Sequence, residues 1–217
     1  MKYNISMLQK PLTKLFGQGR LLEISKGEVI IQPGKKPDGV YYIEEGYIKS
    51  YGYISSGSTN IFLIRQPGEM FPLMWAFKGE QTDVYYSSMT NAKLRIISKS
   101  EFSDYLKNNP KDNELIIDNI LTLYKRRVTK VEILEHRLAL HRIVALLIHL
   151  EEDFGERKLL QRLIPIPIRH QDIADSTNMS RETASRELAK LQKDGHIFYQ
   201  DGRIGIKSLK KLKALLD

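Results

Sequence analysis

The sequence contains no cysteine among its 217 residues. This absence excludes disulfide bonds, thiolate nucleophiles, cysteine-ligated zinc sites and cysteine-ligated iron–sulfur clusters. No apolar stretch approaches the roughly 18 residues that a membrane-spanning helix requires, and the N-terminal segment lacks the apolar region of a secretory signal. Together these absences favour a cytoplasmic protein with no membrane partner.

Histidine is scarce as well, since only five are present and none precedes His136. This distribution argues against a metalloenzyme built on a β-barrel, because such a site needs a cluster of histidines and carboxylates. The sequence also contains no nucleophile motif and no phosphate-binding loop. We therefore expect a protein that is not an enzyme and that holds no metal or cofactor.

Positive charge is what the sequence has in excess. It contains 34 lysines and arginines against 26 aspartates and glutamates, for a net charge of +8. A basic balance suits a polyanionic partner such as nucleic acid, but many basic proteins bind none, so the placement of the charges decides. The length allows one or two domains, and we divide the chain into residues 1–111, 112–138 and 139–217.

The first part is rich in turn signals, with glycine and proline recurring at short intervals over residues 17–98. Between them lie short runs of β-branched and aromatic side chains, at 29–31, 40–43, 47–48, 61–64 and 94–97. Short strands at such intervals are typical of a β-sandwich or a small β-barrel. The pattern alone does not decide between these two.

The second part is predicted to hold a long dimerisation helix over 112–136 and a hinge, because glycine and proline are absent after Pro110. One set of side chains recurs at alternating spacings of three and four residues: Ile117, Ile120, Tyr124, Arg127, Val131, Leu134 and Leu138. Such a seam is typical of a helix that pairs with a partner helix, here from a second copy of the chain. Arg127 interrupts it. The alternative is a helix that packs only on its own barrel.

The third part combines short helices with a hairpin. We expect helices over 170–176 and 181–194, with Ser180 as the N-cap residue of the second. Asp201 and Gly202 lie between two short strand-like runs, which is a strong hairpin signal. Two short helices followed by a hairpin indicate a winged helix-turn-helix.

Helical spacing gives the second of these helices an inner face of Ala184, Leu188 and Leu191. Arginine can donate two hydrogen bonds to guanine O6 and N7, and a carboxylate can accept one from cytosine N4. The outer face therefore predicts base contacts from Arg181, Glu182, Ser185 and Arg186. The predicted phosphate contacts beside them are Ser180, Thr183 and Lys190. The alternative is a surface helix with charge pairs such as Glu182 with Arg186.

The motifs Gln171-Asp172-Ile173-Ala174 and 180–186 resemble those of the CRP/FNR family of bacterial transcription regulators, and residues 26–51 are similar to its early β-hairpins. The resemblance covers residues 15–207. It implies an α+β chain with an N-terminal β-roll (a jelly-roll, cyclic-nucleotide-binding-like), a long dimerisation helix and a C-terminal winged helix-turn-helix. It also implies a homodimer on double-stranded DNA, with RNA polymerase as a further partner of an activator.

The resemblance also assigns roles to individual residues. Family members that bind GTGA-type half-sites use Arg-Glu-x-x-x-Arg, and those that bind TTGAT-type half-sites use Glu-x-x-Ser-Arg. This sequence fits both patterns, so we expect a palindrome that contains TGA. The positions that contact phosphate around the first helix correspond to Arg169, His170 and Gln171.

The family's sensors of cyclic AMP use a Gly-Glu turn, which Gly68 and Glu69 match, and an arginine followed by serine or threonine. Thr82 and Asp83 stand at those last two positions. Without the arginine the cyclic phosphate loses its bidentate clamp, so we expect no binding of cyclic AMP in the usual mode. The helix positions that would face an adenine hold Arg127 and Val128. Another small-molecule effector stays open, as does a sensing module that acts through protein contacts.

Overall fold

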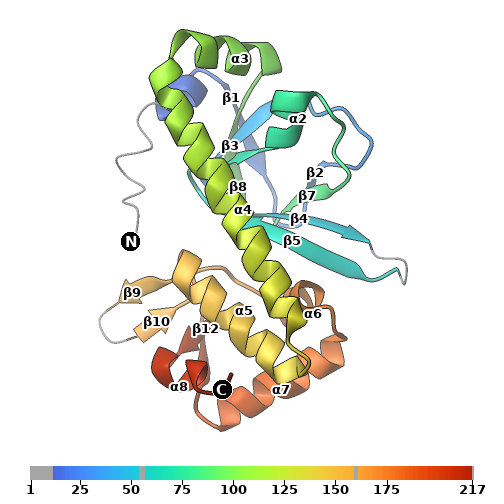
Figure 1. The fold of residues 1–217 in the computed structure, drawn as a ribbon, viewed down its shortest axis with the longest axis vertical. Coiled ribbons are helices and arrows are strands. Elements are labelled where there is room, and N and C mark those ends of the chain that lie inside the picture. Colours follow the sequence, from blue (N-terminus) through green and yellow to red (C-terminus); the bar gives the residue numbers. More distant parts are fainter. Residues whose placement is uncertain (1–11, 54–56, 159–160, 217) are drawn as a thin grey trace. The chain divides into compact units, whose positions relative to one another are not determined.

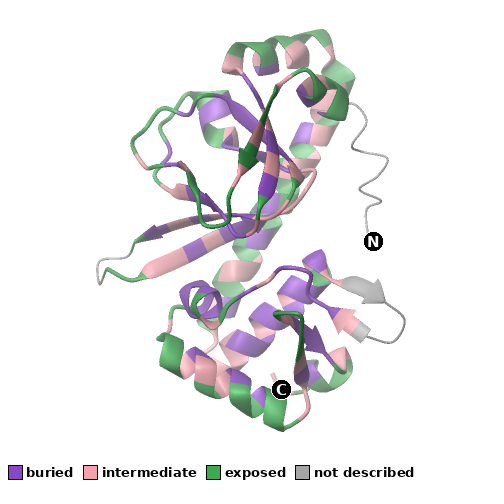
Figure 2. Ribbon diagram, turned by 180° about the vertical axis from the view of Figure 1, so that it is seen from behind, coloured by how far each residue is buried: buried purple, intermediate pink, exposed green. Residues whose placement is uncertain are grey.

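The computed structural model describes residues 12–53, 57–158 and 161–216. The chain forms two compact units. The first comprises the described residues up to Gly52 together with Leu63–Lys125, and the second comprises Tyr53–Phe62 together with the residues from Arg126 onward. Each unit has its own buried interior, as Figure 2 shows.

Two antiparallel sheets form most of the N-terminal half of the chain (Figure 1). One has the strand order β1-β8-β3-β6 and the other β2-β7-β4-β5. The strands are β1 (Arg20–Ile24), β2 (Val29–Ile31), β3 (Val40–Glu45), β4 (Ile48–Tyr53), β5 (Thr59–Arg65), β6 (Met70–Phe71), β7 (Tyr85–Ser88) and β8 (Ala92–Ile97). Four of the five predicted runs lie on strands and the fifth, 47–48, overlaps β4 at Ile48, whereas β1, β6 and β7 were not predicted.

A core cluster takes side chains from both sheets, so the two sheets face each other as a β-roll. Ile31 and Ile48 come from one sheet, and Tyr41 and Leu94 come from the other. Phe71 stacks on Tyr41 with ring centres 5.1 Å apart. This arrangement decides the alternative left by the sequence in favour of two packed sheets, whose apolar side chains alternate inward along each strand.

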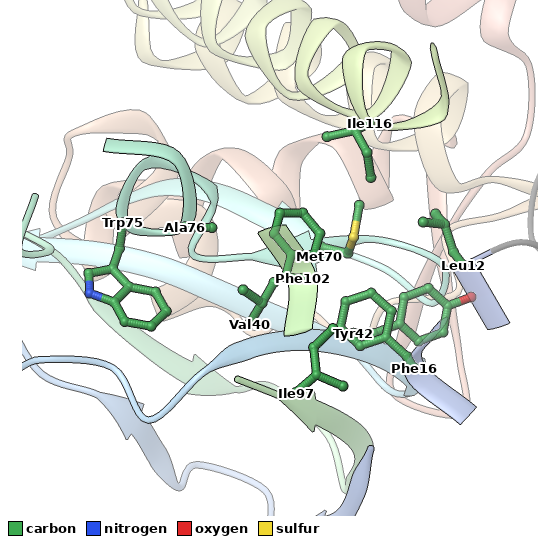
Figure 3. Packing of buried hydrophobic residues seen from close by; sticks show 10 residues of the cluster. All are labelled: Leu12, Phe16, Val40, Tyr42, Met70, Trp75, Ala76, Ile97, Phe102 and Ile116. Atoms are coloured by element: carbon green, nitrogen blue, oxygen red, sulfur yellow. The ribbon is translucent and has the colours of Figure 1, made fainter. Parts of the chain in front are cut away.

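A second cluster covers the opposite face of the β3–β8 sheet (Figure 3). Phe16, from a helical turn over 12–17, stacks on Tyr42 of β3 at 5.1 Å, and Phe102 of α3 completes the aromatic group. The helices on this side are α2 (Leu73–Lys78), α3 (Lys99–Asn108) and the short 3₁₀ turn η1 (Pro110–Asp112). Ile116, near the start of the next helix, also belongs to the cluster.

That next helix, α4 (Asn113–Glu135), is the predicted long helix. It ends one residue before the predicted limit at 136, and Leu138 adopts an extended backbone as the N-cap residue of α5 (Ala139–Phe154). The prediction that Leu138 continues the helical seam is therefore wrong. No glycine or proline marks this break in the sequence.

The second unit carries a helix-turn-helix and a small sheet of order β11-β12-β10-β9. Its elements after α5 are β9 (Glu156–Lys158), β10 (Gln161–Leu163), α6 (His170–Thr177), α7 (Arg181–Lys193), β11 (Ile197–Gln200), β12 (Arg203–Ile206) and α8 (Leu209–Lys213). The predicted hairpin is β11–β12, and both of its turn residues, Asp201 and Gly202, have positive φ. Gly205 is required on β12, because an added Cβ would lie 2.1 Å from the ring of Phe198.

Candidate nucleic-acid interface

A tight turn joins α6 to α7. Asn178 ends α6 in the left-handed conformation, with φ of 50°, which asparagine tolerates better than most residues. Two residues later the Ser180 hydroxyl accepts a hydrogen bond from the Thr183 amide at 3.1 Å and so caps α7. Ile173 lies on the inner face of α6 and Leu188 on the inner face of α7, and both side chains are inaccessible to solvent. The turn and the packing together fix the direction of α7.

The outer face of α7 is open to solvent in the single chain. Arg181 and Glu182 are exposed, the Arg186 side chain is 71% accessible, and Ser185 is half-buried. Arg186 forms its ion pair with the adjacent Glu187, 3.4 Å away, rather than with Glu182 one turn earlier. The Glu182–Arg186 pair that illustrated the surface-helix alternative is therefore not formed.

The Glu182 carboxyl lies at the N-terminal end of α7. Hydrogen bonds from its own backbone amide and from the Ser180 hydroxyl hold the pKa of this carboxyl below its usual value. Glu182 is therefore ionised at neutral pH and offers only acceptor oxygens to a partner. Acceptor oxygens of this kind suit the N4 amino group of cytosine.

The predicted phosphate ligands fall into two groups. Ser180, Thr183 and Lys190 lie on α7, with Ser180 and Lys190 exposed. Around the start of α6, Arg169 is 67% exposed but has its Nε 3.2 Å from Asp172, and Gln171 donates to Asp175 at 2.7 Å. His170 differs from the expectation, because both of its ring nitrogens lie within hydrogen-bond distance of protein groups.

Cations from outside the helix-turn-helix satisfy the carbonyl end of α6. Lys130 of α4 donates to the carbonyl of Ser176, and Arg142 of α5 donates to the carbonyl of Thr177 at 3.0 Å. Positive charge is stabilising at a helix C-terminus. Neither contact could be predicted from the sequence, because each joins residues 35 or more positions apart and no short motif indicates it.

Stability should depend on pH through Lys130. Burial lowers the pKa of Lys130 from its ordinary 10.5 to about 8, and the nearby Asp175 only partly opposes this. Between these two values the unfolded chain binds more protons than the folded one, so the free energy of unfolding rises with pH. We expect it to rise by about 1–3 kcal/mol relative to Lys130→Met from about pH 7 to about pH 10. Urea unfolding of both proteins measures this difference, and a difference independent of pH would contradict the assignment.

A stripe of exposed apolar side chains runs along α4. The members of this outer stripe, all between 39% and 67% exposed, are Ile117, Leu121, Tyr124, Val128 and Val131. Away from the stripe the helix is buried at Ile116, Leu123 and Ile133. The observed stripe contains Val128 where the predicted seam placed Arg127. Ile120 is also exposed at its edge, and Leu134 is half-buried.

Arg127 therefore does not interrupt the stripe. Its guanidinium lies 5.5 Å from the centre of the Phe62 ring, which places it on the flank of α4. The preceding Arg126 is 5% exposed and binds Asp153 at 2.8 Å. The predicted seam shares Ile117, Tyr124 and Val131 with the outer stripe, and its role in pairing with a second copy stays a prediction.

Four of the residues predicted for the effector pocket lie in the β-roll, namely Gly68, Glu69, Thr82 and Asp83. Gly68 has a φ of 92° and its amide donates to Ile43, which keeps the Gly-Glu turn against β3. Glu69 and Thr82 are buried, but Asp83 is exposed. Arg127 and Val128 belong to the second unit, so their role toward an effector stays a prediction.

Arg65 lies three residues before the Gly-Glu turn of Gly68 and Glu69. Its side chain is buried in the β-roll at 6% exposure. Its Nη1 donates to the Ser50 hydroxyl at 3.2 Å, and its guanidinium lies 5.2 Å from the centre of the Tyr86 ring. A buried arginine is therefore present in this domain, but on β5 rather than at the positions of Thr82 and Asp83.

The described residues contain no cluster of three or more histidines and carboxylates placed to hold a metal ion. None of their helices combines the length and apolarity needed to cross a membrane.

A two-sheet β-roll, a long helix and a winged helix-turn-helix together define a class of two-domain transcription regulators. The family description "Cyclic nucleotide-binding domain" matches residues 21–109, and "Crp-like helix-turn-helix domain" matches residues 141–215. The chain belongs to the CRP/FNR family of transcription regulators, as its motifs predicted. It is thus a regulator with a helix-turn-helix DNA-binding domain.

Individual relatives agree with this assignment. The nitrogen fixation regulation protein FixK of Rhizobium meliloti (strain 1021) is 27% identical over 190 residues, which are 87% of this chain and 83% of that protein. The structure of a CooA mutant from Carboxydothermus hydrogenoformans has a TM-score of 0.80 at 17% identity, covering 100% of this chain and 97% of that one. FixK2 from Bradyrhizobium japonicum has a TM-score of 0.77 at 19% identity, with coverages of 91% and 96%. These structural similarities concern the fold.

Proposed function

We propose that the protein is a cytoplasmic, homodimeric and sequence-specific DNA-binding transcription regulator that recognises a palindrome containing TGA. The outer face of α7 carries this proposal. Arg181, Glu182 and Arg186 stand exposed at the N-terminal half of a helix whose inner face is buried. Guanidinium and carboxylate groups in this arrangement can distinguish guanine and cytosine in the major groove.

The outer stripe of α4 supports the dimer. Five apolar side chains on one side of a helix would be covered by the same stripe of a second copy. The two recognition helices of such a dimer would enter successive major grooves, about 34–36 Å apart. Palindromic DNA matches this symmetry, and an activator would contact RNA polymerase as a further partner.

The β-roll is proposed as a sensor that does not use cyclic AMP in the usual mode. The position expected to carry the phosphate-binding arginine holds Thr82, and the exposed Asp83 carboxylate follows it. We expect calorimetric titration with cyclic AMP to give no measurable heat of binding beyond dilution. Low-micromolar affinity accompanied by stronger DNA binding would contradict this expectation.

The competing function is a sensing module that acts through protein contacts alone. The exposed acidic and guanidinium face of α7 favours DNA, since a protein-only module would not need it. Fluorescence anisotropy with a TGA palindrome and with a scrambled duplex of equal length and composition separates the two. Preference for the palindrome supports the regulator, and equal affinity for both duplexes would favour the competing function.

A further inference from the structure

Three side chains from three elements meet beside the outer face of α7. The Nδ1 atom of His170, the first residue of α6, lies 2.9 Å from the Ser185 hydroxyl of α7. Its Nε2 atom lies 3.1 Å from the phenol oxygen of Tyr199 on β11. The centres of the His170 and Tyr199 rings are 6.1 Å apart. One imidazole therefore links the wing to a residue that the proposed function places at the base edges.

A neutral imidazole has one N–H donor and one lone pair, so this chain of hydrogen bonds has a direction. Either Tyr199 donates to Nε2 and Nδ1–H donates to Ser185, or every bond is reversed. The phenol, with an ordinary pKa of about 10, is a far stronger acid than an aliphatic alcohol. It is therefore the better donor to the imidazole lone pair. Burial raises the pKa of Tyr199 further, so its proton is present at neutral pH.

We propose that Tyr199 and His170 are positioning residues that make Ser185 a hydrogen-bond donor toward DNA. Tyr199 donates to Nε2, Nδ1–H donates to the Ser185 oxygen, and the Ser185 hydroxyl proton is left to point outward. Its partner is an acceptor on a base edge in the major groove, namely thymine O4 or a purine N7. The wing thus sets the chemistry of the recognition helix without touching the base. This inference rests on the proposed function.

The first test measures base preference at each position of the half-site. We expect Ser185→Ala to lower affinity for the palindrome by about 2- to 10-fold and to remove the preference at one base pair. Tyr199→Phe, which deletes only the phenol oxygen, should weaken the preference at the same base pair. The double variant should lose no more there than Ser185→Ala alone.

Lys190→Ala is the control, because loss of a phosphate contact lowers affinity for all sequences alike. If Tyr199→Phe also lowers every affinity alike, or leaves the preference at that base pair intact, the positioning role is wrong.

The second test needs no DNA. Nitrogen-15 NMR of the full chain reports which ring nitrogen of His170 carries the proton. We expect the Nδ1–H form in the wild type and a shift toward the Nε2–H form in Tyr199→Phe. An Nε2–H form in the wild type would overturn the inference whatever the DNA result. Equal affinity for palindromic and scrambled DNA would instead contradict the proposed function, so the two failures are distinguishable.

Discussion

Replacing Leu121 by glutamate is expected to convert the dimer into monomers and to lower affinity for the palindrome by about 100-fold or more. Leu121 lies in the outer stripe of α4 and is 57% exposed in the single chain. In the proposed dimer it would face the same apolar stripe of the partner, where two carboxylates would lose their hydration without gaining a cation. Each monomer would then bind one half-site without the gain from linking two.

Light scattering measures the first effect and fluorescence anisotropy the second. Thr122→Glu is the matched control, since Thr122 is exposed on α4 outside the stripe and receives the same charge. It should leave both the mass and the affinity unchanged. Circular dichroism checks the folding of each variant, which is expected to be intact because both positions are exposed. A Leu121→Glu protein that remains dimeric would contradict the assignment of the stripe.

Replacing Arg186 by alanine is expected to weaken binding to the palindrome by about 1–3 kcal/mol, which is roughly 5- to 150-fold. The reason is the loss of two parallel hydrogen bonds to one guanine. The Arg186 side chain is 71% exposed and its Nε lies 3.4 Å from the carboxylate of Glu187, so its removal should disturb the fold little. Affinity for scrambled DNA should fall much less, and the preference for guanine at one position should disappear.

Arg186→Lys keeps the charge but loses the planar pair of donors. We expect it to retain affinity for scrambled DNA and to lose most of the guanine preference. Lys190→Ala should behave in the opposite way and weaken binding to all sequences equally. The slope of log affinity against log salt concentration should become shallower by about one. Arg186 would be a phosphate ligand instead if its alanine variant weakened palindromic and scrambled DNA equally.

Local chemistry accounts for the elements that the sequence predicted. The helix-turn-helix could be predicted because Ser180 and the Asp201-Gly202 pair specify an N-cap and a hairpin turn on their own, and both occur as expected. The five β-runs were visible because their β-branched and aromatic side chains lie between glycine turns. Strands β6 and β7 escaped prediction, because β6 has two residues and β7 is a short run of tyrosines and serines.

Contacts between distant segments account for what the sequence could not show. No sequence motif near Lys130 predicts its hydrogen bond to the carbonyl of Ser176, which is 46 residues away. The Arg65–Ser50 pair requires two strands to be placed side by side. The link from His170 to Ser185 and Tyr199 needs three elements to converge. Leu138 was placed on the helical seam because the break between α4 and α5 carries no glycine or proline.

The central claim is that the outer faces of two α7 helices contact bases in successive major grooves. Methylation interference at guanine N7 on the TGA palindrome tests it most directly. We predict that methylating the TGA guanine blocks binding at two centres about one helical turn, or 10–10.5 base pairs, apart, and that Arg186→Ala is insensitive to it. Binding unaffected by methylation at every guanine would contradict the account.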